Sequence, residues 1–495
     1  MAAVVPTLNQ RNAFRRMAET AGITATQLAE EIEMPVDLMT RLFADERLMP
    51  DSQIFVRTGM YFWETPGDFL SVDAAGPSLW DLIGQPERAG ETFRITLCGM
   101  GNLGHVFAGR LANRPGIQVN LLVSSPERVD ALMTAMAVND GIRVRASGGD
   151  SVGRPHTVTA DPAAVIPESQ LVLFCVPTHV QPALLERVVP HMTNGTLLGA
   201  IPAVGGFHWL AQQALARHDK QAVVFGMVSI PWMCKVVQQG QEVRILGAKQ
   251  VNGIATLAQD RVQHVADLMA ALTGAAAFDL GSFLQITLNP GNQLLHPGIM
   301  YSLFRDWQGE ALPWAEAPLF YEGLSEAGAG ILSDLSDELQ AIRAAVEAAQ
   351  PGLSLEAVLP LQMSVLGTYG DLIPDQTSLR TIIASNPAYA GIRTPMRAVA
   401  GGLVPELNSR FFHEDVPFGL VVLRSLAQLG GVATPKLDMI LTWAQGLMGK
   451  SYLVDGRMTG PDMAESGAPV CFGLTSMAEV IHSSERDGLT TSLVG

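Results

Sequence analysis

Residues 93–111 read FRITLCGMGNLGHVFAGRL, and this stretch decides the fold of the central part of the chain. Its first six residues, Phe93–Cys98, are mostly apolar and predict a buried strand. The residues after Gly101 predict a helix that ends between Arg110 and Asn113. Between strand and helix stands GMGNLG, residues 99–104, which is a G-x-G-x-x-G motif. A strand, this motif and a helix in succession are typical of a nucleotide-binding βα unit.

Each glycine of the motif has a physical purpose in such a unit. Gly99 makes the tight turn, Gly101 lets the backbone approach a pyrophosphate, and Gly104 lets helix and strand pack closely. Asn102 and Leu103 begin the helix, whose free N–H groups attract an anion. The motif therefore predicts that a nicotinamide dinucleotide binds here, with these five residues as its contacts.

The end of the next predicted strand, Val119–Val123, bears on the choice of dinucleotide. An NAD enzyme often has an acidic residue there for the ribose 2′-hydroxyl, but this chain continues with Ser124 and Ser125. Together with Arg128, these hydroxyls are suited to a 2′-phosphate. The sequence therefore favours NADP over NAD, although Arg128 can also be read as a solvated helix residue.

The segment around the motif predicts an α/β domain over residues 91–280. Short apolar runs alternate with helical stretches, which is the pattern of a doubly wound Rossmann sheet with helices on both faces. We expect Val176 and Pro177 to line the nicotinamide side, because ligands of such sheets lie at the carboxyl ends of the strands. The predicted strands are Phe93–Cys98, Val119–Val123, Leu171–Val176, Thr196–Ile201, Ala222–Met227 and Val243–Leu246.

Residues 1–90 predict a small helical N-terminal module. The run GITATQLAEEIEMPVDLMTRLF, residues 22–43, resembles the paired helices of a helix-turn-helix, and Thr24 and Gln27 have the spacing of a capping box. Between Arg11 and Trp63, however, there are six arginines, no lysine and eight acidic residues. This balance favours a structural or dimer-forming module over a DNA-binding one.

Composition limits the class of protein. Of 495 residues, 48% are hydrophobic and 16% are charged, which argues for a compact enzyme of two or three domains and against disorder. The apolar runs are too short to span a membrane, no signal peptide is recognisable, and we expect a cytoplasmic protein. The net charge of −16 disfavours nucleic acid as a partner. The four cysteines form no C-x-x-C pair, so no metal site is predicted.

Residues 281–495 predict a mainly helical substrate domain that contains two segments dense in polar residues. These are NPGNQLLHPGIMY, residues 289–301, and the stretch from Thr394 to Gly419. A histidine can exchange a proton near neutral pH, an aspartate can fix its tautomer, and an arginine can hold a carboxylate with two hydrogen bonds. Such groups suit the reduction of a keto acid or an imine, but a single histidine is more often a structural residue.

A resemblance goes further than these residue types. The runs LNPGNQLLHPGIMY, LFYEG at residues 319–323, and SRFFHEDVPFGLVVLRSLAQLGGVATP are similar to the opine dehydrogenases, the octopine/nopaline dehydrogenase family. SIPWMCK, residues 229–235, resembles the family segment that ends the dinucleotide domain. The resemblance covers about Phe93 to Leu447. It implies an NAD(P)H-dependent enzyme that condenses an amino acid with a 2-keto acid such as pyruvate and reduces the imine, and it is compatible with a homodimer.

The resemblance also implies residue roles. His296 is similar to the family's catalytic acid/base, Asp415 to its carboxylate partner, and Arg410 to the clamp for a substrate carboxylate. Asn292 would share that pocket if its segment is helical. Ala203 and Val204 stand where octopine-type members carry a glutamine, which leaves the keto acid open. The sequence interpretation takes Tyr321 and Glu322 as packing residues, His413 as a surface residue or one behind the site, and Cys234 as a buried thiol.

Two other functions remain open at this point. One is a simple reductase of 2-keto or 3-hydroxy acids, which needs no amine. The other is a redox-sensing regulator in which the N-terminal helices bind DNA. The amino acid, the keto acid and the oligomeric state are not given by the sequence.

Overall fold

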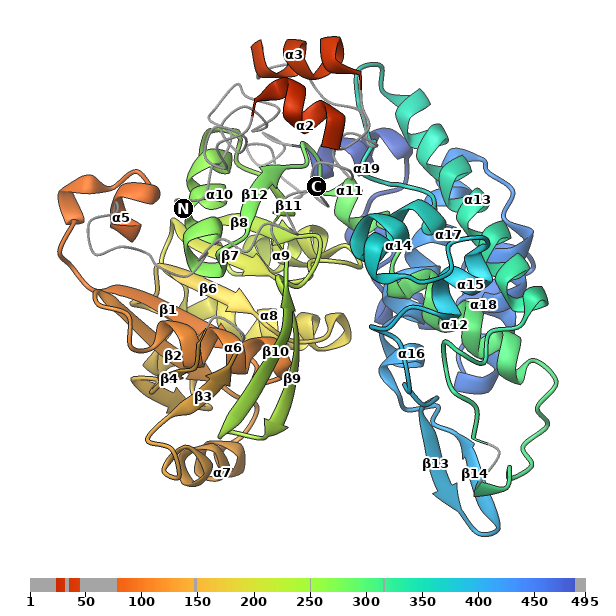
Figure 1. The fold of residues 1–495 in the computed structure, drawn as a ribbon, viewed down its shortest axis with the longest axis horizontal. Helices are drawn as coiled ribbons and strands as arrows, with labels where there is room; N and C mark the ends of the chain where they lie inside the picture. Colours follow the sequence, from red (N-terminus) through yellow and green to blue (C-terminus); the bar gives the residue numbers. More distant parts are fainter. Residues whose placement is uncertain are drawn as a thin grey trace.

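The computed structural model describes residues 24–31, 35–44, 78–146, 149–249, 251–314 and 317–485. Figure 1 shows a domain built on a β-sheet beside a domain of helices, with the short helices α2 and α3 at the top. A hairpin of β13 (Met396–Val399) and β14 (Gly402–Pro405) projects from the helical domain. In the part of the chain that is described, no helix is long and apolar enough to cross a membrane.

The first domain contains an eight-stranded sheet in the order β12-β11-β8-β7-β6-β1-β2-β5. All neighbouring pairs are parallel except β8 and β11, which run antiparallel. The central strands are fully buried, as expected for a sheet covered on both faces. This confirms the predicted doubly wound fold. The strands are β1 (Phe93–Cys98), β2 (Ile117–Leu122), β5 (Thr157–Thr159), β6 (Leu171–Phe174), β7 (Thr196–Ala200), β8 (Ala222–Met227), β11 (Val251–Thr256) and β12 (Ala276–Asp279).

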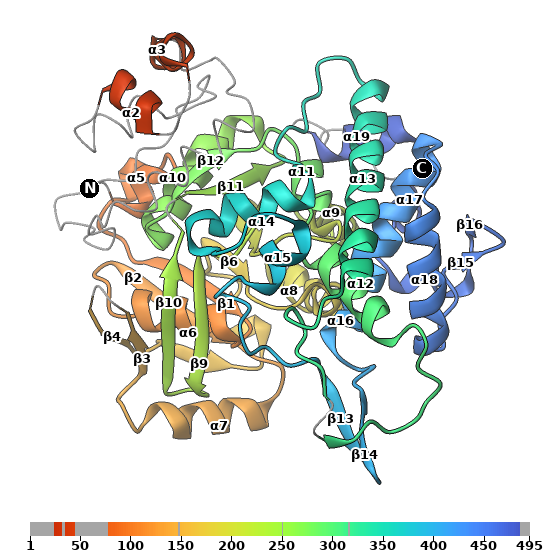
Figure 2. The ribbon, with the colours of Figure 1, turned by 45° about the vertical axis from the view of Figure 1, so that its right-hand side comes forward.

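One predicted strand belongs to a different sheet. Residues 243–246 lie in β10 (Glu242–Ala248), which pairs antiparallel with β9 (Trp232–Gln238) and parallel with β3 (Ile142–Arg145). With β4 (Ser151–Gly153) these strands form a second, four-stranded sheet, and Figure 2 shows β9 and β10 lying across helix α6. From Val243 onward, less exposed residues of β10 alternate with exposed ones, which is typical of a sheet with only one covered face.

The helices of the sheet domain follow the strands in the usual alternation. After β1, β2, β6 and β7 come α6 (Asn102–Leu111), α7 (Pro126–Met136), α8 (Gln181–Val188) and α9 (Phe207–Arg217). The short α5 (Leu79–Leu82) packs near α10 (Val262–Thr273).

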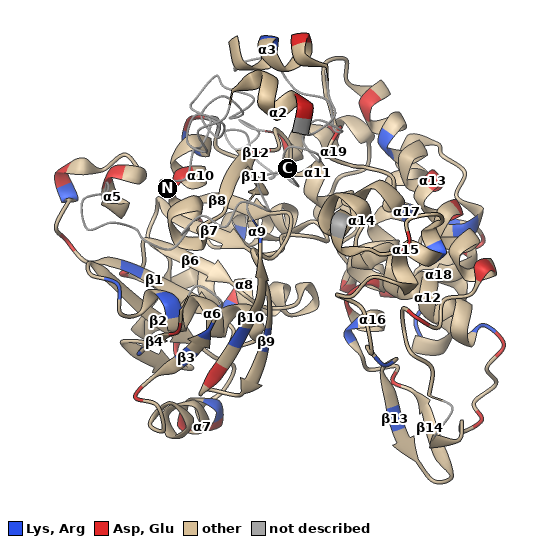
Figure 3. Ribbon diagram, viewed as in Figure 1, with Lys and Arg blue, Asp and Glu red and all other residues tan. Residues whose placement is uncertain are grey.

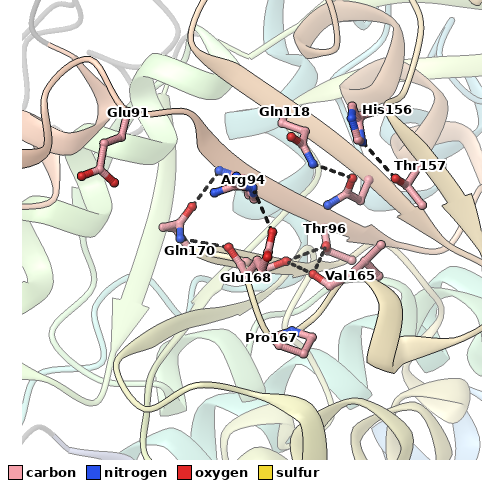
Figure 4. A network of polar contacts seen from close by, with 12 residues as sticks. Glu91, Arg94, Thr96, Gln118, His156, Thr157, Val165, Pro167, Glu168 and Gln170 are labelled. Carbon is pink, nitrogen blue, oxygen red and sulfur yellow. Dashed lines mark hydrogen bonds and ion pairs between the residues drawn. The ribbon is translucent and has the colours of Figure 1, made fainter.

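Polar contacts fix the amino ends of the central strands, on the side away from the nucleotide motif. The backbone N–H of Arg94 donates to Gln170 Oε1 at 2.8 Å, and the Arg94 guanidinium pairs with Glu168 at 3.3 Å. The hydroxyls of Thr96 and Ser169 lie 2.7 Å apart. Figure 4 shows how this network connects β1 to the segment that precedes β6.

The second domain is mainly helical, as predicted. Its long helix, α13 (Glu326–Ala349), packs against α12, α17 and α18, and its buried residues recur at helical spacing. The other helices are α11 (Leu284–Thr287), α12 (Asn292–Phe304), α14 (Leu361–Tyr369), α15 (Leu379–Ala384), α16 (Arg410–His413), α17 (Val421–Gly430), α18 (Pro435–Met448) and α19 (Met477–Ser484).

Helix α19 returns from the helical domain to the sheet domain and packs against α9. There His208 is fully buried, stacks on Phe283 with ring centroids 4.7 Å apart, and places Nε2 2.9 Å from Ser484 Oγ. Burial lowers the pKa of His208 to about 3. The imidazole is therefore neutral in the folded protein at every pH near neutrality.

We expect His208 to make the protein less stable as pH falls below 6.5. An unfolded histidine has a pKa of about 6.5, so between that pH and about 3 only the unfolded state binds this proton. The free energy of unfolding should then fall by about 1 kcal/mol per pH unit because of this residue. Urea unfolding at pH 7, 6 and 5 should show a shallower dependence in His208→Gln. The exposed His482→Gln is the control, and parallel curves for wild type and His208→Gln would contradict the assignment.

The N-terminal helices α2 (Ala25–Glu31) and α3 (Val36–Ala44) form as the sequence predicted. Thr24 N–H donates to Gln27 Oε1 at 2.8 Å, and Gln27 N–H donates to Thr24 Oγ1 at 3.2 Å, which completes the capping box. Figure 3 shows acidic residues on this pair, and Arg41 is the basic residue of α3. The preference for a structural over a DNA-binding role stays a prediction.

Candidate active site

The glycine motif adopts the geometry that a bound dinucleotide requires. Gly99 has φ +103°, and a Cβ there would lie 2.3 Å from Val176 Cγ1. A Cβ on Gly104 would lie 2.2 Å from Gly99 O, so helix α6 packs directly on the turn. At Gly101, by contrast, a Cβ would meet nothing nearer than Cys175 O at 4.0 Å. The space over Gly101 is free for a pyrophosphate, and the residues present fit the cofactor.

The hairpin of β9 and β10 holds this motif from the side of α6. Val236 N–H donates to Asn102 Oδ1 at 2.9 Å, so the hairpin engages the side-chain oxygen of Asn102. His105 lies between the Gly101 carbonyl, 2.9 Å from Nδ1, and the Gly240 N–H, which donates to Nε2 at 2.8 Å. Burial lowers the pKa of His105. A neutral imidazole thus connects the hairpin turn to the glycine motif.

The residues predicted for the ribose lie at the end of β2. The hydroxyl of Ser125 caps α7 by accepting from Arg128 N–H at 3.4 Å, while Ser124 and the Arg128 side chain are exposed. A cavity of about 660 Å³ adjoins Ser124 and is also lined by Asp161 and Arg187. The structure therefore leaves Ser124 and Arg128 accessible, but the Ser125 hydroxyl already has a structural contact.

The structure brings together His296 and Asp415, which are 119 positions apart in the chain. His296 Nδ1 lies 2.7 Å from Asp415 Oδ2, and both side chains are buried. A carboxylate can only accept, so Nδ1 carries the proton in this contact. His296 Nε2 lies 3.2 Å from the hydroxyl of Tyr321, which can donate to it. The pair has the geometry of an oriented acid/base, with Nε2 as the exchanging atom.

Aromatic rings enclose the pair. Phe411 stacks on the imidazole of His296 with centroids 3.8 Å apart, and Phe320 meets its edge at 5.7 Å. Tyr321 stacks on Tyr389 at 4.1 Å, and burial raises the pKa of Tyr321. The sequence interpretation of Tyr321 as a packing residue thus missed its contact with His296. The signal that could have indicated this contact was the position of Tyr321 within LFYEG, one of the runs that carry the family resemblance.

Glu414 joins the two domains beside this pair. Its carboxylate is buried, Oε1 accepts from Thr178 N–H at 2.8 Å, and Oε2 pairs with Arg410 Nη2 at 2.8 Å. Thr178 directly follows Val176 and Pro177 at the end of β6, where the nicotinamide was expected. The bridge therefore places Arg410 and the His296–Asp415 pair against that strand end.

A π-helical turn positions Asp415. Residues Val416–Leu420 form this turn, and Leu420 N–H donates to Asp415 O at 3.0 Å, five residues back. Asp415 N–H likewise donates to Arg410 O at 3.2 Å. Turns of this kind insert one extra residue into a helix and are frequent at functional sites.

The remaining sequence candidates take varied positions. Asn292 is the exposed first residue of α12, one turn before His296, so its segment is helical as expected. Glu322 accepts from Gly391 N–H at 2.7 Å, which fits a packing role. His413 is exposed. Cys234 is half-buried, and burial raises the pKa of its thiol to about 11.

Among the residues that the structure describes, no three His, Cys, Asp or Glu side chains gather as metal ligands. A cavity of about 870 Å³ between the domains is lined by His179, Arg217, His413 and Lys450, among others. None of the predicted site residues lines this cavity.

Comparisons with known proteins agree with this arrangement. The family model "NAD/NADP octopine/nopaline dehydrogenase, alpha-helical domain" matches residues 279–448, and that of ketopantoate reductase matches residues 95–251. Tauropine dehydrogenase of Arabella iricolor is 33% identical over 78% of this chain and 99% of that protein. Octopine dehydrogenase of Mizuhopecten yessoensis is 31% identical over 80% of this chain and 100% of that protein. A solved octopine dehydrogenase with NADH and L-arginine has a TM-score of 0.70 at 29% identity, covering 79% of this chain and 98% of that one.

Proposed function

Because this chain belongs to the opine dehydrogenase family, we propose that it condenses an amino acid with a 2-keto acid and reduces the resulting imine at the expense of NAD(P)H. The observation that carries the proposal is the buried His296–Asp415 pair. Glu414, next to Asp415, bonds to the end of β6, which is the neighbour of the strand that leads into the glycine motif. The four cysteines are free, which supports the cytoplasm as the compartment.

In the proposed reaction His296 moves the protons. The amine nitrogen attacks the keto carbon, and the carbonyl oxygen must gain two protons to leave as water. Protonated His296 Nε2 supplies one of these, and the attacking amine loses the other. Asp415 keeps Nδ1 protonated and stabilises the imidazolium. The bound dinucleotide supplies the hydride that reduces the imine carbon.

The surrounding residues bind and exclude water. The Arg410 guanidinium is half exposed and holds Glu414, so its free N–H groups can clamp a substrate carboxylate. Asn292 lies one helical turn from His296 and can contact the same substrate. The rings of Phe411, Phe320 and Tyr389 keep the reaction dry, which an imine needs because water hydrolyses it.

The test is the loss of 340-nm absorbance from NADPH, and separately NADH, with pyruvate or 2-oxoglutarate and each amino acid in turn. Oxidation of NADPH or NADH that requires both an amino acid and a keto acid supports the proposal. Oxidation with the keto acid alone would replace it with the simple reductase. If no combination of these substrates leads to oxidation of NADPH or NADH, the proposed function fails.

We further propose that the enzyme prefers NADPH through Ser124 and Arg128. Ser124 follows β2 and Arg128 lies in the first turn of α7, and both residues are exposed. Neither carries negative charge, and a 2′-phosphate would gain the guanidinium as a partner. Arg128→Ala should raise the KM for NADPH about 10-fold and leave that for NADH unchanged. Steady-state kinetics with both cofactors measures this. An equal change in the KM for NADPH and for NADH, or a wild type that prefers NADH, would contradict this proposal.

A further inference from the structure

Lys249 is a partly buried lysine that has no carboxylate partner among the described residues. Its side chain is partly buried, and Nζ donates to Ser229 Oγ at 2.5 Å. Within the described ranges, no aspartate or glutamate forms an ion pair with it, unlike Lys436 and Lys450. Burial lowers the pKa of its ammonium to about 8, so most of it remains charged at pH 7. Keeping such a charge from water without a partner costs stability.

The neighbours of Lys249 are polar but neutral, and they also hydrogen-bond to each other. Ser229 Oγ accepts from the ammonium and donates to Asn252 Oδ1 at 3.0 Å. Asn252 Nδ2 in turn donates to Ser229 O at 2.7 Å. The Lys249 backbone is fixed as well, because its N–H donates to Pro231 O at 2.9 Å. The hydroxyl therefore cannot neutralise the lysine, and two of its three ammonium hydrogens have no partner among the described residues.

The position of this cluster connects it to the active site. Ser229 comes two residues after β8, at the carboxyl end of the strand, where ligands of open α/β sheets lie. The Glu414 bridge contacts the corresponding end of β6 at Thr178, and β7 lies between β6 and β8. Ala203, after β7, donates its N–H to Met227 O at 3.0 Å. Lys249 thus lies beside the third of three neighbouring strand ends at this edge of the sheet.

We propose that Lys249 is a specificity residue that binds a side-chain carboxylate of one of the two substrates. The inference rests on the proposed function and narrows it to an acidic amino acid or an acidic keto acid. An incoming carboxylate would supply the missing counter-charge through the unused ammonium hydrogens, while Ser229 and Asn252 hold the lysine in place. Amines with cationic side chains would be rejected there by like-charge repulsion.

The test compares an acidic with a neutral substrate in each of the two substrate roles. With pyruvate as the keto acid, kcat and KM are measured for L-aspartate and L-asparagine; with L-asparagine as the amine, they are measured for oxaloacetate and pyruvate. The enzymes are wild type, Lys249→Gln, Lys249→Arg and the control Lys235→Gln, which removes an exposed lysine from β9. Melting temperatures are recorded for all four.

Wild type should prefer the acidic member of one pair by about 10-fold or more in kcat/KM, and that pair identifies the source of the carboxylate. Lys249→Gln should abolish this preference by raising the KM for the acidic member, with the neutral member changed less than about 2-fold. Lys249→Arg should retain part of it, and Lys235→Gln all of it. The inference is overturned if wild type shows no preference for an acidic substrate. It is also overturned if Lys249→Gln lowers kcat/KM equally for the acidic and the neutral substrate, or if it lowers only the melting temperature. Oxidation of NAD(P)H that requires both an amine and a keto acid but lacks this preference refutes the inference alone. The proposed function fails as well only if the full panel of amino acids and keto acids also gives no oxidation.

Discussion

His296→Ala is expected to lower kcat by about 10²–10⁴ without weakening NAD(P)H binding, because the variant loses the only oriented acid/base of the described site. The imidazole is fixed on one side by Asp415 at 2.7 Å and lies away from the glycine motif, which comes from the other domain. Stopped-flow or steady-state turnover measures the first effect, and cofactor fluorescence titration measures the second.

The controls for this variant are chosen from its surroundings. Asp415→Asn should lose much of the same activity, since the amide can present N–H to Nδ1 and so favour the wrong tautomer. His413→Ala, which removes an exposed histidine two residues from Asp415, should keep full turnover. A His296→Ala enzyme that turns over normally, or that no longer binds cofactor, would refute the acid/base role.

Gly101→Ala is expected to lower the affinity for NAD(P)H about 100-fold while leaving the melting temperature of the free protein unchanged. Gly101 has φ −82° and ψ −164°, which any residue adopts, and the nearest atom to an added Cβ is 4.0 Å away. The new methyl group would therefore occupy only the space that the pyrophosphate needs. Titration calorimetry and thermal unfolding report the two quantities.

Gly104→Ala provides the contrast. Its Cβ would lie 2.2 Å from Gly99 O, so this variant should lose stability even without cofactor. If Gly101→Ala bound the cofactor as wild type does, the pyrophosphate would not lie over that residue. If instead Gly101→Ala destabilised the free protein, the conclusion that the space above Gly101 is open would be wrong.

The cofactor domain could be predicted from sequence because its signals are local. The strand, the turn and the helix from Phe93 to Leu111 are contiguous, and each glycine acts on neighbours within that segment or on the adjacent strand end. The strand at residues 243–246 was assigned to the wrong sheet for the opposite reason. Its apolar run indicates a strand but does not indicate which strand it pairs with. The pairing with β9 comes from the hairpin that joins the two strands.

The catalytic pair could not be derived from residue types alone. His296 and Asp415 meet only after α12 and the turn at Val416–Leu420 pack together, and only the family resemblance indicated the pairing. The contacts of Tyr321, Glu414 and Lys249 were not predicted at all. Each depends on two segments far apart in sequence, and none of these side chains has a spacing pattern that distinguishes it from a packing or surface residue.

The π-helical turn after Asp415 makes the active site sensitive to chain length as well as to composition. Residues of an α-helix are about 100° apart around the axis, so removing one residue from Val416–Leu420 would rotate everything before the turn relative to α17 by about that angle. The shortened chain could still form a continuous helix and bury a similar amount of apolar surface. Its carboxylate, however, would point away from the imidazole. Homologues that share the chemistry should therefore accept substitutions in this turn far more readily than single-residue deletions, and gaps in the helical domain should fall elsewhere.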